Sequence, residues 1–117
     1  MIDDIGEQLV GWGTVLRLEM RGRTSGRPIE VAIGFVEDAD GTLLVAAGSD
    51  DADWARNLVA EPSCRVSIGD DRWPATAELL EGGDAAHAIR ELILRYGTPA
   101  ERLGRGPAFR IRRQSPR

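Results

Sequence analysis

The feature that most constrains this chain is a series of short segments in which apolar and polar residues alternate. In residues 13–21, Leu16, Leu18 and Met20 share one face and charged residues occupy the other. A period of two predicts a strand with one buried face. The segments that follow are separated by turns such as Asp40-Gly41, which are too short for the crossovers that parallel strands require. The sequence therefore predicts a protein built mainly from antiparallel strands.

The same pattern places the individual elements. Six strands are predicted, at residues 13–21, 29–37, 42–47, 64–69, 72–81 and 107–113. Helices are predicted at residues 2–11, from a cap at Ser49 or Asp50 to Pro62, and from a cap at Asp84 to about Tyr96. Small residues on one face of the second strand leave room for a curved sheet. We expect a mostly β protein (α+β), a six-stranded antiparallel split β-barrel with peripheral helices.

Length and composition narrow the function classes. The 117 residues suit one domain, 1–117, with residues 114–117 expected to fray. No apolar run approaches the ~20 residues that span a bilayer, and the N-terminus lacks a signal-peptide pattern, so we expect a cytoplasmic protein. Cys64 and His87 are each the only residue of their type, which argues against a disulfide framework and a cysteine metal site. All 15 basic residues are Arg, so a P-loop lysine is excluded, and the net charge of −4 argues against a nucleic-acid partner.

The segment from Arg21 to Pro28, which we call the basic turn, is the main candidate binding site. Its glycines permit close backbone approach, and its successive N–H groups could form a nest for an anion. Arg23 and Arg27 would add charge-assisted hydrogen bonds. The basic turn therefore suits a phosphate or a polycarboxylate, although an arginine-rich hairpin turn would have the same sequence.

Two blocks resemble the deazaflavin-dependent nitroreductase family of F-420-dependent oxidoreductases. Members carry T-G-R-K-S-G and a later strand ending in G-F-V, and here Arg21-Gly22-Arg23-Thr24-Ser25-Gly26 and Gly34-Phe35-Val36 occupy those places. The family's W-x-x-N-L-x-A-x-P is matched by Trp54-Ala55-Arg56-Asn57-Leu58-Val59-Ala60-Glu61-Pro62. The resemblance covers about residues 14–113 and makes the chain a short, divergent member.

The resemblance implies a split-barrel, flavin-reductase-like fold of the FMN-binding type and the hydride-donating coenzyme F-420. By position, the basic turn would hold the phosphate and glutamyl tail of the coenzyme, and the ring would lie near the start of the Trp54 helix. The candidate cofactor-binding residues are Arg23, Thr24, Ser25, Gly26, Arg27, Ala47, Gly48, Ser49, Trp54 and Asn57. No catalytic side chain and no metal ligand is assigned, because the cofactor carries the chemistry. Arg23→Ala is expected to weaken coenzyme binding with little change in folding.

Three cations of the family pattern are missing. Thr24 replaces a Lys, Ile29 replaces an Arg, and residues 47–50 lack a Lys. Each lost charged hydrogen bond to a phosphate costs about 1.5–3 kcal/mol. Arg27, Arg56 or Arg65 would have to compensate.

Several functions stay open at this point. The first is an F-420-dependent reductase of a small conjugated, nitro or quinone-like substrate. The alternatives are the same barrel binding FMN, haem or a fatty acid, and a non-catalytic module that has lost its cofactor site. The face formed by Leu16, Leu18 and Met20 suits either a homodimer contact or an internal core.

Overall fold

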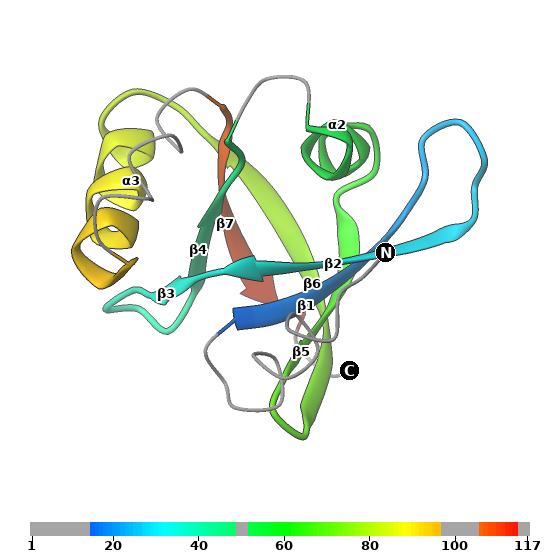
Figure 1. Ribbon diagram of the computed structural model, residues 1–117, viewed down its shortest axis with the longest axis horizontal. Coiled ribbons are helices and arrows are strands. Elements are labelled where there is room, and N and C mark those ends of the chain that lie inside the picture. The colour runs from blue at the N-terminus through cyan, green and yellow to red at the C-terminus, as the bar shows by residue number, and fades with distance from the viewer. Residues whose placement is uncertain (1–14, 49–51, 97–105, 115–117) are drawn as a thin grey trace.

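Seven β-strands form one sheet, with every paired neighbour antiparallel, that curls into an open barrel (Figure 1). The computed structural model describes residues 15–48, 52–96 and 106–114. The elements are β1 (Val15–Arg21), β2 (Pro28–Gly34), β3 (Val36–Glu37), β4 (Leu43–Ala46), α2 (Asp53–Ala60), β5 (Ser63–Ile68), β6 (Asp71–Leu80), α3 (Gly82–Tyr96) and β7 (Ala108–Arg113). The sheet order is β2-β1-β5-β6-β7-β4-β3. The predicted antiparallel split barrel is confirmed, and the helix predicted at residues 2–11 lies outside the described residues.

The number of strands is seven rather than six, because the predicted strand 29–37 is interrupted at Phe35. β2 and β3 lie at opposite edges of the sheet, so the chain crosses the barrel opening at this residue. The backbone of Phe35 finds its partners outside the sheet. Its N–H donates to the Tyr96 hydroxyl at 2.9 Å, and that hydroxyl donates to the Phe35 carbonyl at 3.0 Å. A Cβ on Gly34 would lie 3.0 Å from the Tyr96 ring, so a larger residue would have to push the ring away.

The barrel interior is filled from the inward faces of the strands. Leu16 and Leu18 are fully buried and Met20 is 3% exposed, and they pack in one cluster with Val66 and Phe109. This apolar face of β1 is therefore the core of its own chain and is not available as a dimer contact.

β4 is buried on both faces, as its uninterrupted apolar sequence predicts. Leu43 and Val45 point into the barrel cluster, whereas Leu44 and Ala46 belong to a second cluster that includes Leu92 of α3. α3 covers this outer face of the barrel.

The helices differ from the prediction at their starts. α2 begins at Asp53, and its N-cap residue, Ala52, makes no side-chain capping hydrogen bond. The predicted caps Ser49 and Asp50 lie outside the described residues. α3 begins at Gly82, whose φ of +59° turns the chain out of β6, so Asp84 lies in the first turn instead of capping the helix. No helix among the described residues is long and apolar enough to cross a membrane.

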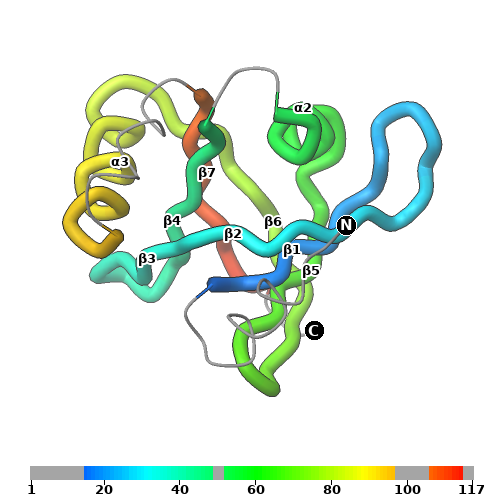
Figure 2. Tube along the Cα trace, in the orientation of Figure 1, coloured from blue at the N-terminus to red at the C-terminus, as the bar shows by residue number. Residues whose placement is uncertain are grey.

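The helices take different positions around the barrel. Figures 1 and 2 show α3 on one side of the sheet and α2 on the side from which the β1–β2 turn projects. The two sequence motifs of interest, the basic turn and α2, therefore lie on the same side of the molecule.

Candidate functional site

The basic turn is a hairpin loop with its own internal hydrogen bonds. Gly22 N–H donates to the Arg27 carbonyl and Gly26 N–H donates to the Gly22 carbonyl, both at 2.9 Å. Arg27 N–H donates to Ser25 Oγ at 3.1 Å. Gly26 has a φ of +71°, and a Cβ on Gly22 would lie 2.7 Å from Ser25 Oγ. The backbone conformation therefore favours glycine at position 26, and a side chain at position 22 would have to displace Ser25.

The basic turn is attached to α2 through one buried amide. Asn57 is 2% exposed, and its Oδ1 accepts from the backbone N–H of Arg23 at 3.0 Å and from Arg23 Nη1 at 2.7 Å. Arg23 also donates to the Asp53 carbonyl and pairs with the Asp53 carboxylate, each at 3.3 Å. The structure thus brings Arg23 and Asn57, two of the predicted site residues, into direct contact.

These contacts decide which donors of the basic turn remain for a ligand. The backbone N–H groups of Gly22, Arg23, Gly26 and Arg27 have intramolecular partners. Within the described residues, the N–H groups of Thr24 and Ser25 and the guanidinium of Arg27 have none. The loop tip therefore offers two N–H donors and one free positive charge to solvent.

The other predicted residues lie at the carboxyl end of β4 and on α2. Ala47 is 1% exposed with its methyl group in the core, and its N–H donates to the Pro107 carbonyl at 2.9 Å. Gly48 is exposed, and a Cβ placed there would meet no heavy atom within 4 Å. The Trp54 ring packs 5.9 Å from the Phe109 ring at an interplanar angle of 48°. Gly48 thus has exposed backbone with open space around it, and the Trp54 ring is held in place by Phe109. Ser49 lies outside the described residues.

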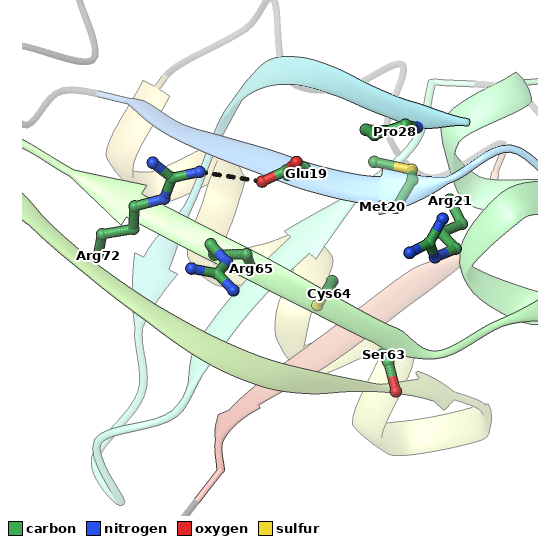
Figure 3. Close-up of a pocket in the computed structure, with 8 residues that line it drawn as sticks. All are labelled: Glu19, Met20, Arg21, Pro28, Ser63, Cys64, Arg65 and Arg72. Carbon is green, nitrogen blue, oxygen red and sulfur yellow. Dashed lines mark hydrogen bonds and ion pairs between the residues drawn. The ribbon is translucent and has the colours of Figure 1, made fainter. Parts of the chain in front are cut away.

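A groove on the outer face of the sheet begins at the base of the basic turn (Figure 3). Its volume is about 460 Å³, and it is lined by Glu19, Met20, Arg21, Pro28, Ser63, Cys64, Arg65 and Arg72. Arg72 pairs with Glu19 at 3.1 Å. Arg65 is one of the compensating cations expected from the sequence, whereas Arg72 is not, because its partner Glu19 is 53 positions away in the chain.

Cys64 lies at this groove as a half-buried thiol. Its Sγ contacts the Ala75 carbonyl at 3.6 Å, and its side chain packs against the core. Burial raises the pKa of the Cys64 thiol to about 11, so the thiol stays protonated at neutral pH. Cys64 therefore behaves as a small apolar residue and not as a nucleophile.

A second charged cluster joins the β3–β4 turn to α3 and β7. Asp38 pairs with Arg110 at 2.8 Å and with His87 at 3.1 Å, and Arg110 also donates to Thr42 Oγ1 at 2.7 Å. The Arg110 and His87 side chains hold the pKa of the Asp38 carboxyl well below its usual range. His87 and Asp38 are 49 positions apart in the chain, so no local sequence pattern predicts their contact.

Comparisons with known proteins identify the family of the chain. The model of the F420H(2)-dependent quinone reductase family matches residues 2–102. The chain belongs to this family. Membership confirms the resemblance that the basic turn and the Trp54 helix indicated, and the family's description names reduced F-420 as the reductant.

Individual members and solved structures support the same assignment. An F420H(2)-dependent quinone reductase of Mycobacterium tuberculosis is 28% identical over 87 residues, which are 72% of this chain and 58% of that protein. The chain spans about three fifths of the length of the curated relatives that it matches. A solved F420-H2-dependent reductase has a TM-score of 0.70 at 25% identity, covering 84% of this chain and 93% of its own. A haem storage protein of Vibrio cholerae has a TM-score of 0.75 at 21% identity, covering 94% and 88% respectively, and shows a shared fold.

Proposed function

We propose that this chain binds coenzyme F-420 and uses its reduced form to reduce a small quinone-type substrate. The observation that carries the proposal is the contact between Arg23 and Asn57. This contact brings together the two motifs on which the family resemblance depends, the basic turn and the Trp54-to-Asn57 helix. Membership of the F420H(2)-dependent quinone reductase family supplies the coenzyme and the substrate class.

The described residues fit a ligand that is anionic at one end and planar at the other. The N–H groups of Thr24 and Ser25 and the guanidinium of Arg27 would bind a phosphate. The open backbone at Gly48 leaves space for a ring, and Trp54, fixed by Phe109, would limit how that ring can tilt. When bound, the reduced coenzyme supplies the hydride.

Arg23 has a positioning role in this proposal. Its guanidinium holds the basic turn against α2 through Asn57 and Asp53, so the donors at the loop tip keep a fixed position relative to Trp54 on the same helix. A fixed distance between the phosphate donors and the ring site lowers the entropy cost of binding. The chain's own contribution to the reaction is therefore binding and orientation, which agrees with the lack of an assigned catalytic side chain.

A fluorescence titration of the purified chain with oxidised F-420, beside FMN, tests the coenzyme. We expect micromolar or tighter binding of F-420, weakened in Arg27→Gln and unchanged in Arg90→Gln, which removes the same charge from the exposed surface of α3. Mixing the reduced coenzyme with a simple quinone should then yield the hydroquinone, as the quinone takes up a hydride and a proton. A preference for FMN, or binding of neither compound, would refute the proposal and favour the alternative ligands or a non-catalytic module.

A further inference from the structure

The groove at the base of the basic turn is an arginine-rich surface that the cofactor residues predicted from the sequence do not include. It begins where Arg21 of β1 pairs with Pro28 of β2, the two residues that bracket the loop. It then continues across β1, β5 and the start of β6 (Figure 3). A ligand bound at the loop tip could therefore extend into the groove without crossing the barrel.

The charge in this groove is not balanced internally. Its lining includes Arg21, Arg65 and Arg72 against a single carboxylate, Glu19. Glu19 lies directly opposite Arg65 in the β1–β5 register, yet its carboxylate pairs with Arg72 on the next strand at 3.1 Å. Arg65 therefore has no ion-pair partner among the residues that the structure describes, although a carboxylate stands opposite it.

Arg21 is the second uncompensated charge. Its Nη1 donates to the Gly26 carbonyl at 2.7 Å, a neutral partner that fixes the side chain and leaves its charge unmatched. Because Glu19 faces Arg65, Arg21 stands diagonally across from Arg65 on the same face. Diagonal neighbours in an antiparallel pair are about 7–8 Å apart, so two guanidinium groups can bind successive carboxylates of one flexible chain.

The walls of the groove suit the uncharged groups of a flexible ligand that carries several carboxylates. Pro28 and Cys64 offer apolar contact, and Ser63 offers a hydroxyl. Methylene groups between carboxylates would lie against the apolar residues, and amide groups could use the hydroxyl. A single phosphate would use only one of the two guanidinium groups, whereas a chain of carboxylates uses both.

The tip of the basic turn has too few free cations to bind a ligand with several carboxylates. Between the strand ends at Arg21 and Pro28, Arg23 already binds Asn57 and Asp53, and among the described residues only Arg27 keeps an unpaired guanidinium there. The loop tip can thus hold one anionic group, and further anionic groups of the same ligand need other partners.

We propose that Arg21, at the base of the basic turn, and Arg65 form a subsite for the oligo-glutamyl tail of the coenzyme, beyond the phosphate site at the tip of the turn. This proposal rests on the proposed function, because the tail belongs to F-420. It places the tail on the outer face of β1 and β5 and makes these two arginines compensate for the cations missing from the loop.

The test compares two forms of oxidised F-420, one with several glutamyl residues and one without the tail, in fluorescence titrations at low salt. Wild-type protein should bind the tailed form more tightly. Arg65→Gln should weaken the tailed form about ten-fold or more and leave the tail-free form unchanged, because a hydrogen bond to a charged group is lost. Arg90→Gln should change neither affinity, and Arg65 is exposed, so the folded state should be retained, as thermal unfolding will verify.

Three results would overturn the subsite. In the first, wild-type protein binds both forms equally well, and the proposed function then survives without the subsite. In the second, Arg65→Gln weakens both forms to the same extent, which places Arg65 elsewhere in the binding site. In the third, wild-type protein binds neither form, which refutes the proposed function together with the subsite.

Discussion

Asn57→Ala removes the acceptor that holds the basic turn on α2. The Oδ1 atom of this 2% exposed side chain accepts a backbone N–H at 3.0 Å and a guanidinium N–H at 2.7 Å. A neutral hydrogen bond contributes about 1 kcal/mol net, and one to a charged group about 1.5–3 kcal/mol. The Arg23 side chain is 31% exposed, so water recovers part of the charged contact. We expect a loss of about 2–3 kcal/mol, which for a chain of this size lowers Tm by roughly 8–12 °C.

The measurement is urea and thermal unfolding of wild type, Asn57→Ala, Arg23→Ala and the double variant, followed by circular dichroism. Arg23→Ala should also destabilise the fold, because it removes the charged one of the two donors to a buried amide oxygen and leaves only the backbone N–H. This differs from the sequence-based expectation that Arg23 could be removed with little change in folding. Since both residues share one contact, the double variant should be more stable than the sum of the two losses implies. Additivity within about 0.5 kcal/mol would refute the reasoning.

Three further predictions concern other parts of the chain. Tyr96→Phe removes both hydrogen bonds to Phe35 and should cost about 1–3 kcal/mol of unfolding free energy in urea; an unchanged midpoint would show that water replaces the hydroxyl. Because Arg110 and His87 lower the pKa of Asp38 in the folded state, the stability from this carboxylate is present above the unfolded pKa of about 4 and lost as pH falls below it. Asp38→Asn should therefore flatten the decline of urea stability between about pH 5 and pH 2, and an equally steep decline in the variant would contradict this assignment. The Cys64 thiol, whose pKa is raised to about 11, should react with a thiol reagent at pH 7.5 on the order of a hundred-fold more slowly than free cysteine, and equal rates would contradict its burial.

The strands were predictable because the pattern of apolar residues within each strand depends on which of its faces are buried. The alternation in β1 and the uninterrupted apolar run in β4 reflect one buried face and two buried faces respectively. The break at Phe35 could not be predicted in this way. The apolar period continues through that residue, and what ends the strand is the hydroxyl of Tyr96, 61 positions later.

The sequence identifies the two segments that form the candidate site, but it does not predict the contacts between their side chains. The sequence identified the basic turn and the Asn57 helix, and the structure joins them. Arg23, however, was expected to face a ligand, and its contacts with Asp53 and Asn57 depend on how α2 packs against the loop. Ala47 was expected in the site, yet its methyl group lies in the core. The unmatched charge of Arg65 depends on Glu19 reaching across β5 to Arg72, which no local pattern encodes.

The crossing at Phe35 has a consequence for the order in which the chain folds. The β1–β2 and β5–β6 hairpins join neighbours in sequence, whereas the Phe35–Tyr96 contact closes a loop of 61 positions. The entropy cost of closing a loop grows with its length, and distant contacts slow folding. The hairpins should therefore form first, and closure of the barrel opening should come late and reverse early. In hydrogen exchange, the Phe35 amide should consequently lose its protection through partial openings that leave the centre of β1 protected.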